Sequence, residues 1–523
     1  MKKAISLSLI LCVLITAVFF TSCGNEADEP SSAVTEASKA EEQSTPSDVS
    51  EETSAAYVPD IYSGTDYFGK TFTVWSTTWN TSAYTSEIIF NEGNYDEMIS
   101  DGVNNAIQAR NDRVYDTLGV KIDEIYYGSP TRYGSDTLTY IRNFIDAADP
   151  DISAFCICLY DCGTLSLEGV LYDLYSLDNI NPENPWWEQY FNESVTIDNK
   201  LYFTIGDIGF TSMGQTPCVF YNADLIEDLG LEDPVKVAIA GNWTLDKALE
   251  YSKSLCIDSA EPIGRMDYHD QYGWSGQYDD IYAMIYGAGV RILSTGSDGY
   301  PVLTLNNETT IGTVDKLIAL MNDDSYMSGN DYFNESNTPM ELLVDAFEAG
   351  RCIFYSSGVY MAARFEMPDV FGILPVPKFS AEQERYYSLL NTWTTNAYCI
   401  GANLDKEGAE FAAAVLDVMG YYSWKEYPDS IATNYYGVML KNQKLALEDS
   451  EAMLDLIFEA RGCEVGSIYQ IGKLNGGTKA VNDVFVDIIT NNTSGGFASK
   501  YESYADIFEN DVSTLIDTFK NAE

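Results

Sequence analysis

The sequence is poor in positive charge and almost without histidine. Its 523 residues include 29 Lys and Arg against 80 Asp and Glu, which gives a net charge of −51, and His269 is the single histidine. Nucleic acids and anionic lipid surfaces are recognised through clustered cations, so this balance argues against both as electrostatic partners. One histidine cannot supply a multi-histidine metal site, and a histidine-based catalytic triad is nearly excluded. The acidity is typical of a soluble, exposed surface.

Signature sequences of nucleotide and calcium sites are also missing. The chain contains no P-loop, no G-x-G-x-x-G turn and no D-x-D-x-D-G run. Glycoside hydrolysis needs two working carboxylates, but a pair can be drawn anywhere among 80 acids, so spacing carries no information. We therefore expect neither a cofactor nor a metal ion.

No second long apolar segment follows the one at the N-terminus. Two lysines precede an apolar run over 4–20, which is short for a bilayer span of ~20 residues. A positive end, an apolar centre and small residues before a cleavage point are typical of a secretory signal. Cys23 after small residues resembles a bacterial lipobox, in which this Cys is acylated and becomes the mature N-terminus, although Phe20 stands where Leu is usual. A plain signal peptide cleaved nearby is the alternative.

The next segment has the composition of a tether. Residues 25–63 are rich in Ser, Thr, Ala, Glu and Asp and have almost no large apolar side chain before Tyr57. Such a segment cannot bury enough apolar surface to offset its ordering entropy. We therefore expect a signal peptide over 1–22, then the lipidated Cys23 and a disordered acidic tether over 23–63.

The ten cysteines do not form an obvious framework. Cys12 falls in the signal, and most of the others lie in apolar strand-like runs, where free Cys packs as a small hydrophobe. An exported protein can form disulfides, so one local disulfide stays an alternative. The one cluster, Cys156-x-Cys158-x3-Cys162, lacks a second pair or a nearby His, which argues against a metal site.

The chain after the tether is long enough for two lobes or domains. Its first part alternates strands with helices, which predicts a mainly parallel sheet covered on both faces. Period-2 and period-3.6 patterns predict strands over 71–76, 120–126 and 151–160, helices over 96–118 and 133–148, and a short hairpin element over 87–90.

The stretch over 184–222 leads from one compact unit to another. It opens with Trp186-Trp187, continues as a strand over 201–205, and resumes as an apolar strand over 218–221 after a gap that contains glycine. A chain that crosses between units in this way usually has its site in the gap. We therefore expect 201–205 to be the crossing strand and Asp207 to lie at the floor of a cleft.

The second half shows no internal repeat. Thr244 is a good N-cap for the helix that follows it. Further helices are predicted over 279–286, 309–321, 340–348, 406–422, 441–461 and 501–519, and strands over 350–355, 371–376 and 393–401.

Several local patterns occur in the order found in one family. DGVNNAIQARNDRVYDTLGVKI, TIDNKLYFTIGDI and VFYNADL come first, and GNWTLDKALEYSK, AFEAGRCIFY, FGILPVPK and QKLALEDSEAMLDLIFEAR follow. Together they resemble the family 1 extracellular solute-binding proteins of ABC importers, of the bacterial lipoprotein type. The match covers about 71–519 and is specific for the family, not for the ligand.

The resemblance implies an α/β, two-lobed, periplasmic-binding-protein-like (type II) fold with a hinge and an interlobe cleft. Lobe 1 would hold 64–205 and about 397–425, and lobe 2 would hold 206–396 and about 426–470. Residues 471–523 would form a C-terminal helical segment. Open parallel sheets bind ligands at the carboxyl ends of their strands, which agrees with a site between the lobes.

A sugar site needs aromatic planes for the ring faces and polar side chains for the hydroxyls. We expect Trp186, Trp187 and Trp243 to be structural, because they punctuate helix starts. The candidates at strand ends and in loops facing the cleft are Trp75, Trp79, Tyr160, Asp161, Asp207, Trp274, Tyr278, Ser356, Tyr360, Trp393, Tyr435 and Tyr436.

The resemblance implies a monomeric, non-enzymatic receptor, lipid-anchored on the extracellular face of the cell membrane. It would bind a small solute, a mono- or oligosaccharide, and deliver it to an ABC permease. Two alternatives stay open: a secreted carbohydrate-active enzyme on the same architecture, and a surface sensor or adhesion lipoprotein. Measured turnover would favour the enzyme, whereas a neighbouring histidine kinase gene would favour the sensor.

Overall fold

The computed structural model describes residues 67–78, 86–90, 101–128, 135–259, 263–437, 447, 449–459, 461–493 and 496–522. The chain divides by its contacts into Met1–Val58 and Pro59–Glu523, and every described residue belongs to the second unit. The expectations for the signal peptide, Cys23, the tether and Trp79 lie outside the described residues. None of the helices within these ranges is both long and apolar enough to span a bilayer.

The first sheet has the parallel core that the sequence predicts. Its order is β13-β3-β1-β2, from β1 (Thr71–Thr78), β2 (Lys121–Gly128), β3 (Ala154–Cys158) and β13 (Asn396–Cys399). Strand β1 runs parallel to both β2 and β3, whereas β13 runs antiparallel to β3. The carboxyl ends of β1, β2 and β3 therefore meet at one edge of the sheet.

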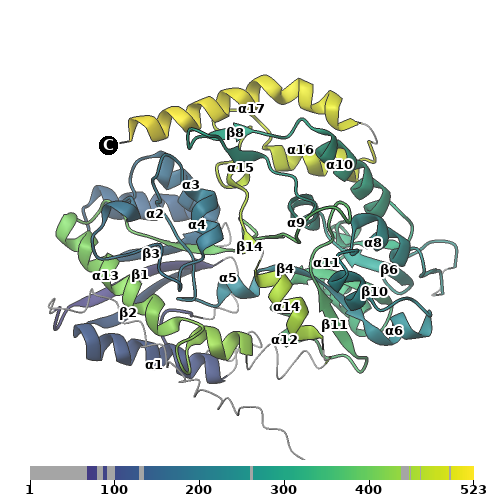
Figure 1. Cartoon of the computed structure of the whole chain (residues 1–523), viewed down its shortest axis with the longest axis horizontal. Helices are drawn as coiled ribbons and strands as arrows, with labels where there is room; N and C mark the ends of the chain where they lie inside the picture. The colour runs from purple at the N-terminus through teal and green to yellow at the C-terminus, as the bar shows by residue number, and fades with distance from the viewer. Residues whose placement is uncertain are drawn as a thin grey trace, which may run out of the picture. The chain divides into compact units, whose positions relative to one another are not determined.

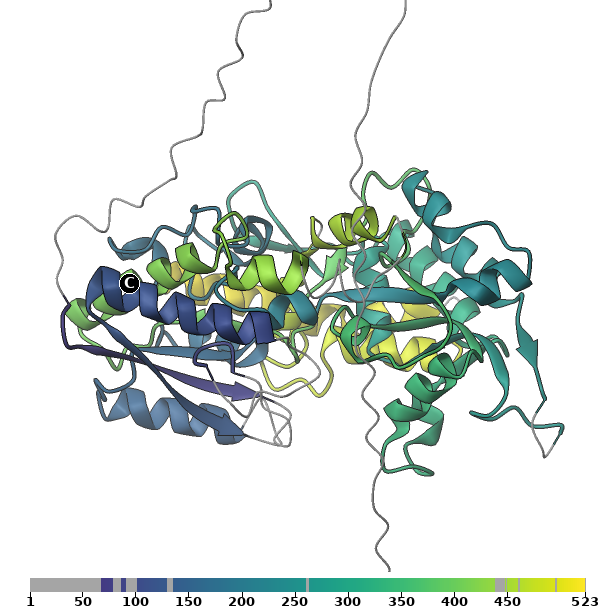
Figure 2. The same cartoon turned by 90° about the horizontal axis from the view of Figure 1, so that it is seen from below.

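Helices cover both faces of this sheet. Helix α2 (Ser135–Asp146) lies on one face, and α1 (Asp101–Leu118) packs with α13 (Lys406–Ser423) on the other, as Figures 1 and 2 show. The apolar spacing that predicted α1 is its buried stripe, which consists of Val103, Ala106, Ile107, Arg110, Val114 and Leu118.

The second sheet is mixed. Strand β10 lies at its centre, parallel to β6 and antiparallel to β4, so the carboxyl ends of β6 and β10 meet at one edge. Its order is β11-β4-β10-β6-β5 with β9 beside β6, from β4 (Pro217–Asn222), β5 (Cys256–Ile257), β6 (Gln271–Gly276), β9 (Tyr326–Ser328), β10 (Cys352–Gly358) and β11 (Phe371–Leu374).

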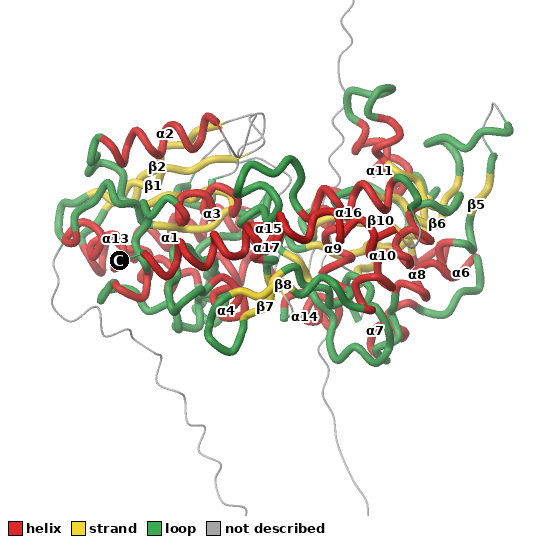
Figure 3. Tube along the Cα trace, turned by 90° about the horizontal axis from the view of Figure 1, so that it is seen from above, coloured by secondary structure: helices red, strands yellow, loops and turns green. Residues whose placement is uncertain are grey.

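Helices surround the second sheet, so that both groups are of α/β type (Figure 3). The helices are α6 (Ala223–Asp228), α7 (Pro234–Ile239), α8 (Leu245–Ser252), α9 (Asp280–Gly287), α10 (Glu308–Met321), α11 (Pro339–Glu348) and α12 (Met361–Arg364). A small hairpin of β7 (Leu293–Thr295) and β8 (Pro301–Leu303) follows α9. Thr244 caps α8 as predicted, because its hydroxyl accepts from the Lys247 N–H at 3.3 Å.

The chain passes between the two groups at three places. The first passage contains α5 (Thr211–Gly214), between residue 204 and β4. The second contains β12 (Ser388–Leu389), which pairs with β14 (Arg461–Gly462). The third runs from α13 to α14 (Ser450–Phe458), which packs against β11.

The C-terminal segment contacts both groups. It comprises α15 (Val465–Ile468), α16 (Val481–Thr490) and α17 (Gly496–Asn521). Helix α15 packs on α3 (Leu159–Leu167), and α17 contacts α3, α10 and β8, running along the edge of both groups in Figure 1. The lobe boundaries given above stay a prediction.

A buried acid and a buried arginine hold the first passage on the first sheet. The Glu87 carboxylate accepts from the Thr211 N–H and the Tyr398 hydroxyl, both at 2.9 Å. Arg110 is fully buried and donates to the carbonyls of Glu87, Ile88 and Ile208. A Cβ on Gly209 would lie 2.5 Å from the Glu87 carboxylate, so this passage has no room for a side chain there.

The paired tryptophans are structural, as expected. Trp186 and Trp187 are 1% and 2% exposed, and each indole N–H donates to the Asp417 carboxylate on α13 at 2.9 Å. Asn184 donates to the same carboxylate at 3.1 Å. These bonds fix the start of the 184–222 stretch on the first sheet's helix. Trp243 is also fully buried.

Three local predictions were wrong. Residues 87–90 form a bend and not a hairpin element. Residues 201–205 contain one isolated bridge, from Thr204 to Tyr398, and not a regular strand. Strand β3 ends at Cys158, before the predicted end at residue 160, and α3 begins directly after it. The largely buried start of α3 continues the apolar run of the buried strand, so the sequence does not mark where the strand ends.

The cysteines in the described residues pack as free thiols. Seven of them are buried, Cys256 is exposed, and none of these eight forms a disulfide. Burial raises the pKa of several of the buried thiols, Cys162 and Cys218 among them, so those thiols stay protonated. The alternative of a local disulfide in the Cys156 to Cys162 cluster is therefore not what the structure shows.

Candidate functional site

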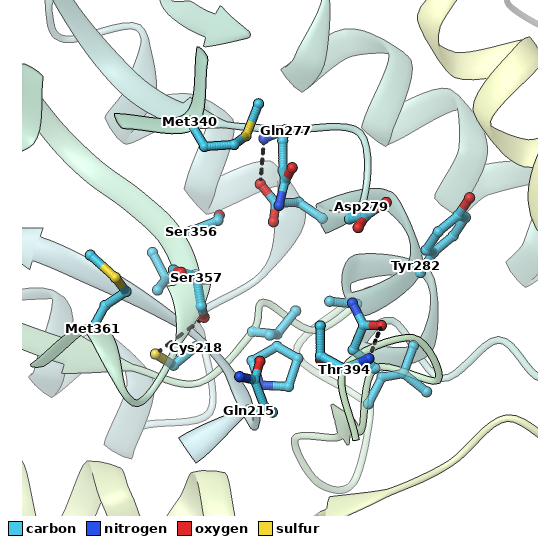
Figure 4. A pocket seen from close by; sticks show the side chains of 18 of the residues that line it. Gln215, Cys218, Gln277, Asp279, Tyr282, Met340, Ser356, Ser357, Met361 and Thr394 are labelled. Carbon is cyan, nitrogen blue, oxygen red and sulfur yellow. Dashed lines mark hydrogen bonds between the residues drawn. The ribbon is translucent and has the colours of Figure 1, made fainter. Parts of the chain in front are cut away.

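A cavity of about 330 Å³ lies where β6 and β10 end, beside the second passage between the lobes. We call it the cleft cavity. Its walls come from the first residues of β4, the loop after β6, the start of α9, the end of β10 and the 391–394 loop. Parallel strands gather ligands at their carboxyl ends, so this is the position that the topology favours for a site. Figure 4 shows the cavity from close by.

Several polar side chains of the cleft cavity have no hydrogen-bond partner among the described residues. They include the amides of Gln215 and Gln277, the carboxylate of Asp279 and the hydroxyl of Thr394. Gln215 lies just before β4, whereas Gln277 and Asp279 follow β6. An amide both donates and accepts, and a carboxylate only accepts, so this set suits a ligand with several hydroxyl or amino groups.

The two acids at the start of α9 have pKa values that burial raises. Burial raises the pKa of Asp279 to about 6. Burial also raises the pKa of Asp280, whose Oδ2 accepts from the Gln277 N–H at 2.8 Å. At pH 7 Asp279 is still mostly ionised, so it presents an acceptor of full charge to the cavity.

Rings and thioethers form the rest of the wall. Tyr282, Tyr360 and Trp393 line the cavity and are each partly exposed. Met340 and Met361 lie near them, and Figure 4 shows both thioethers together with Tyr282 around the same space. Aromatic faces and polarisable sulfur suit the apolar faces of a ring-shaped solute.

The structure places three of the sequence-predicted site residues in the cleft cavity. They are Ser356, Tyr360 and Trp393. The Ser356 hydroxyl also accepts from the Trp274 indole N–H at 2.9 Å. Tyr278 lies between two lining residues, but its ring packs against Phe333 instead of lining the cavity.

Tyr160 and Asp161 start α3 in the first lobe. Tyr160 does not line the cleft cavity. Asp161 is 1% exposed and belongs to the core of the first lobe.

Three other predicted residues are buried inside the lobes and do not line the cleft cavity. Trp75 is 2% exposed and stacks on Tyr127 with ring centres 5.6 Å apart. Trp274 is fully buried and stacks on Trp243 at 6.3 Å. Tyr435 is fully buried and stacks on Phe210. The structure assigns these rings to packing.

Asp207 and Tyr436 line a different cavity, of about 390 Å³, which we call the hinge cavity. Met213 in α5 lines the hinge cavity, whereas Gln215, just after α5, lines the cleft cavity. The Asp207 Oδ2 accepts from the Lys425 N–H at 2.8 Å, and burial raises the Asp207 pKa to about 6. Asp207 is thus in the hinge, but away from Ser356 and the other cleft residues.

Metal binding finds no support in the described ranges. No group of three or more His, Cys, Asp or Glu side chains there is placed to hold a metal ion. The free polar groups of the cleft cavity include two amides, one carboxylate and the Thr394 hydroxyl, which suit hydrogen bonding to an organic solute.

Solved structures share this architecture. The extracellular solute-binding protein from Staphylococcus aureus in complex with maltose matches with a TM-score of 0.52 at 13% identity, over 86% of this chain and 98% of its own. The chain has the solute-binding-protein fold. A cyclo/maltodextrin-binding protein with maltotetraose matches with a TM-score of 0.51 at 12% identity, over 85% and 98% of the two chains.

A third example is the cyclic alpha-maltosyl-1,6-maltose binding protein from Arthrobacter globiformis, with a TM-score of 0.50 at 14% identity, over 86% of this chain and 99% of its own. No family model and no curated protein matches the chain. The resemblance noted in the sequence is therefore confirmed at the level of the solute-binding-protein fold.

The sequence did not single out Gln215, Gln277 or Asp279. Gln277 and Asp279 follow the carboxyl end of β6, where the rule for parallel sheets would have found them, whereas Gln215 precedes the antiparallel strand β4. An aromatic ring stands out in the sequence, whereas a Gln, or one Asp among 80 acidic residues, carries no signal of its own.

Proposed function

We propose that the protein is a receptor that captures a mono- or oligosaccharide in the cleft cavity and makes no covalent change to it. The observation that carries this proposal is the wall of that cavity. A free carboxylate, two free amides and three partly exposed rings converge at the carboxyl ends of β6 and β10. This is the combination that sugars need, since they offer hydroxyl donors and acceptors around an apolar ring face.

The fold supports a receptor that opens and closes. The cleft cavity borders the second passage between the lobes, so bending there moves its walls. A solute that contacts the walls better in the closed form shifts the equilibrium by that difference in affinity. The solved relatives with this fold are binding proteins, and those cited above are described with maltose or maltotetraose, or named for binding cyclic maltosyl-maltose.

The remaining features complete the proposal. Acylation at Cys23 would anchor the chain on the extracellular face of the membrane, and 23–63 would tether the folded unit. The monomeric receptor would then deliver its solute to the permease of an ABC importer. These steps rest on the N-terminal sequence and on the resemblance to the family.

The test is calorimetry and thermal shift of the purified protein against a panel of neutral, amino and acidic sugars. We expect one class to bind with one site per chain, to raise the unfolding temperature, and to be recovered chemically unchanged. If no solute stabilises the protein while a sugar is cleaved, the receptor proposal is wrong.

A further inference from the structure

Asp279 is the charged side chain of the cleft cavity that nothing in the described chain neutralises. It stands at the start of α9, three residues after β6, and Figure 4 shows it on the cavity wall with Gln277 and Tyr282. Its carboxylate has no hydrogen bond and no ion pair with any described residue. A ligand is therefore the partner that this position accommodates.

The charge around Asp279 is one-sided. The described lining includes the acids Asp279, Asp280 and Glu341 and one basic residue, Arg364. An Arg364 nitrogen lies 3.7 Å from the Glu341 carboxylate, so that cation is already engaged by an acid. The described wall thus has more acidic than basic side chains. A negatively charged solute would meet repulsion here, whereas a cation would be attracted.

The rest of the wall also suits a cation. Tyr282, Tyr360 and Trp393 are the partly exposed rings of the cavity. The face of an aromatic ring attracts a cation held within about 6 Å of its centre. A protonated amine on a sugar would therefore have a carboxylate to pair with and ring faces beside it.

A neutral hydroxyl group of a solute would interact less strongly with this wall. It gives a carboxylate one hydrogen bond, whereas an ammonium gives a charge-assisted bond that is roughly twice as strong and adds Coulomb attraction. Since the Asp279 side chain is partly buried, that attraction is less screened than at an exposed site.

We propose that the solute is an amino sugar whose protonated amine pairs with Asp279. This inference rests on the proposed function, because it names the class of solute for the same cavity. It makes Asp279 the residue that selects an amine over an N-acetyl or hydroxyl group at one position of the solute.

The experiment compares three disaccharides that share one linkage and differ in one group. They are the β-1,4 dimer of glucosamine, its N,N′-diacetyl form and cellobiose, each titrated into the purified protein at pH 7 by calorimetry. We expect the free amine to bind about tenfold or more tightly than the other two. Asp279→Asn, which keeps the size of the side chain, should remove that preference.

A matched control comes from a surface acid. Glu250→Gln alters a carboxylate on α8 that pairs with Lys247 and lies outside the cavity, and it should leave the preference intact. Circular dichroism of both variants checks that each is folded.

The outcomes separate this inference from the receptor proposal. If any solute of the wider panel binds without an amine and Asp279→Asn leaves its affinity unchanged, the amino-sugar inference is overturned and the receptor stands. If the amine binds best but the preference survives in Asp279→Asn, the role of Asp279 is overturned. If no solute of any class binds, both proposals fall.

Discussion

Replacing Glu87 by alanine should loosen the contact between the first lobe and the first passage, which contains α5. Its carboxylate is 7% exposed and holds the Thr211 N–H at the start of α5 and the Tyr398 hydroxyl on β13. Glu87→Ala removes both acceptors. It also removes the charge opposite Arg110, whose pKa burial lowers to about 10, so that Arg110 is still ionised at pH 7.

The expected cost follows from what is left behind. A buried donor without a partner costs about 1–3 kcal/mol, and a buried charge that loses its partner costs about 3–5 kcal/mol. The two losses overlap, since the same groups relax together, so we expect Glu87→Ala to lower the free energy of unfolding by about 3–5 kcal/mol. Glu87→Gln keeps an oxygen acceptor and should cost about 1–2 kcal/mol.

Urea denaturation at pH 7, followed by tryptophan fluorescence, measures both variants against wild type. Glu250→Ala is the control, because its carboxylate is exposed and it should change stability by less than about 0.5 kcal/mol. If Glu87→Ala unfolds with the same free energy as the control, or loses no more stability than Glu87→Gln, the carboxylate does not stabilise these contacts.

Three further predictions concern stability. Gly209→Ala places a Cβ 2.5 Å from the Glu87 carboxylate and should cost about 1–3 kcal/mol in the same assay, whereas Gly437→Ala, with nothing within 4 Å, should be near neutral. Asp417→Ala leaves two indoles and one amide without their acceptor and should lower the free energy of unfolding by about 3–5 kcal/mol. Equal stability of this variant and wild type would contradict the prediction. Burial raises the pKa of Asp207 and Asp417 to about 6 in the folded state, above the usual 3.8. Their stabilising contribution is therefore complete below pH 4 and lost as the pH rises through 6, so the unfolding temperature should be higher at pH 5 than at pH 7.5.

The sequence best predicts the elements that bury only one face. The helix expected over 96–118 is observed as α1, and the residues that set its period form its buried stripe. Strands β1, β2 and β3 are parallel, as alternation with helices predicts. In α1 and β2, whose burial alternates, the pattern records which face meets the core, so the periodicity is visible in the chain.

Prediction failed where burial is complete. Strand β3 and the start of α3 form one continuous buried run, and an element without an exposed face has no period to read. The same limit explains the aromatic site candidates. Trp75 and Trp274 lie on buried strands, where a ring packs against neighbouring rings, so their nearness to strand ends did not bring them to the cavity.

The hinge shows a limit of another kind. The gap between 201–205 and β4 contains α5, and its residues line two different cavities. Helix α5 turns the chain so that Asp207 and Met213 line the hinge cavity while Gln215 lines the cleft cavity. Which side a residue faces depends on how Glu87 and the buried arginine seat this turn on the first lobe. That seating uses contacts more than 90 residues apart, which no local pattern records.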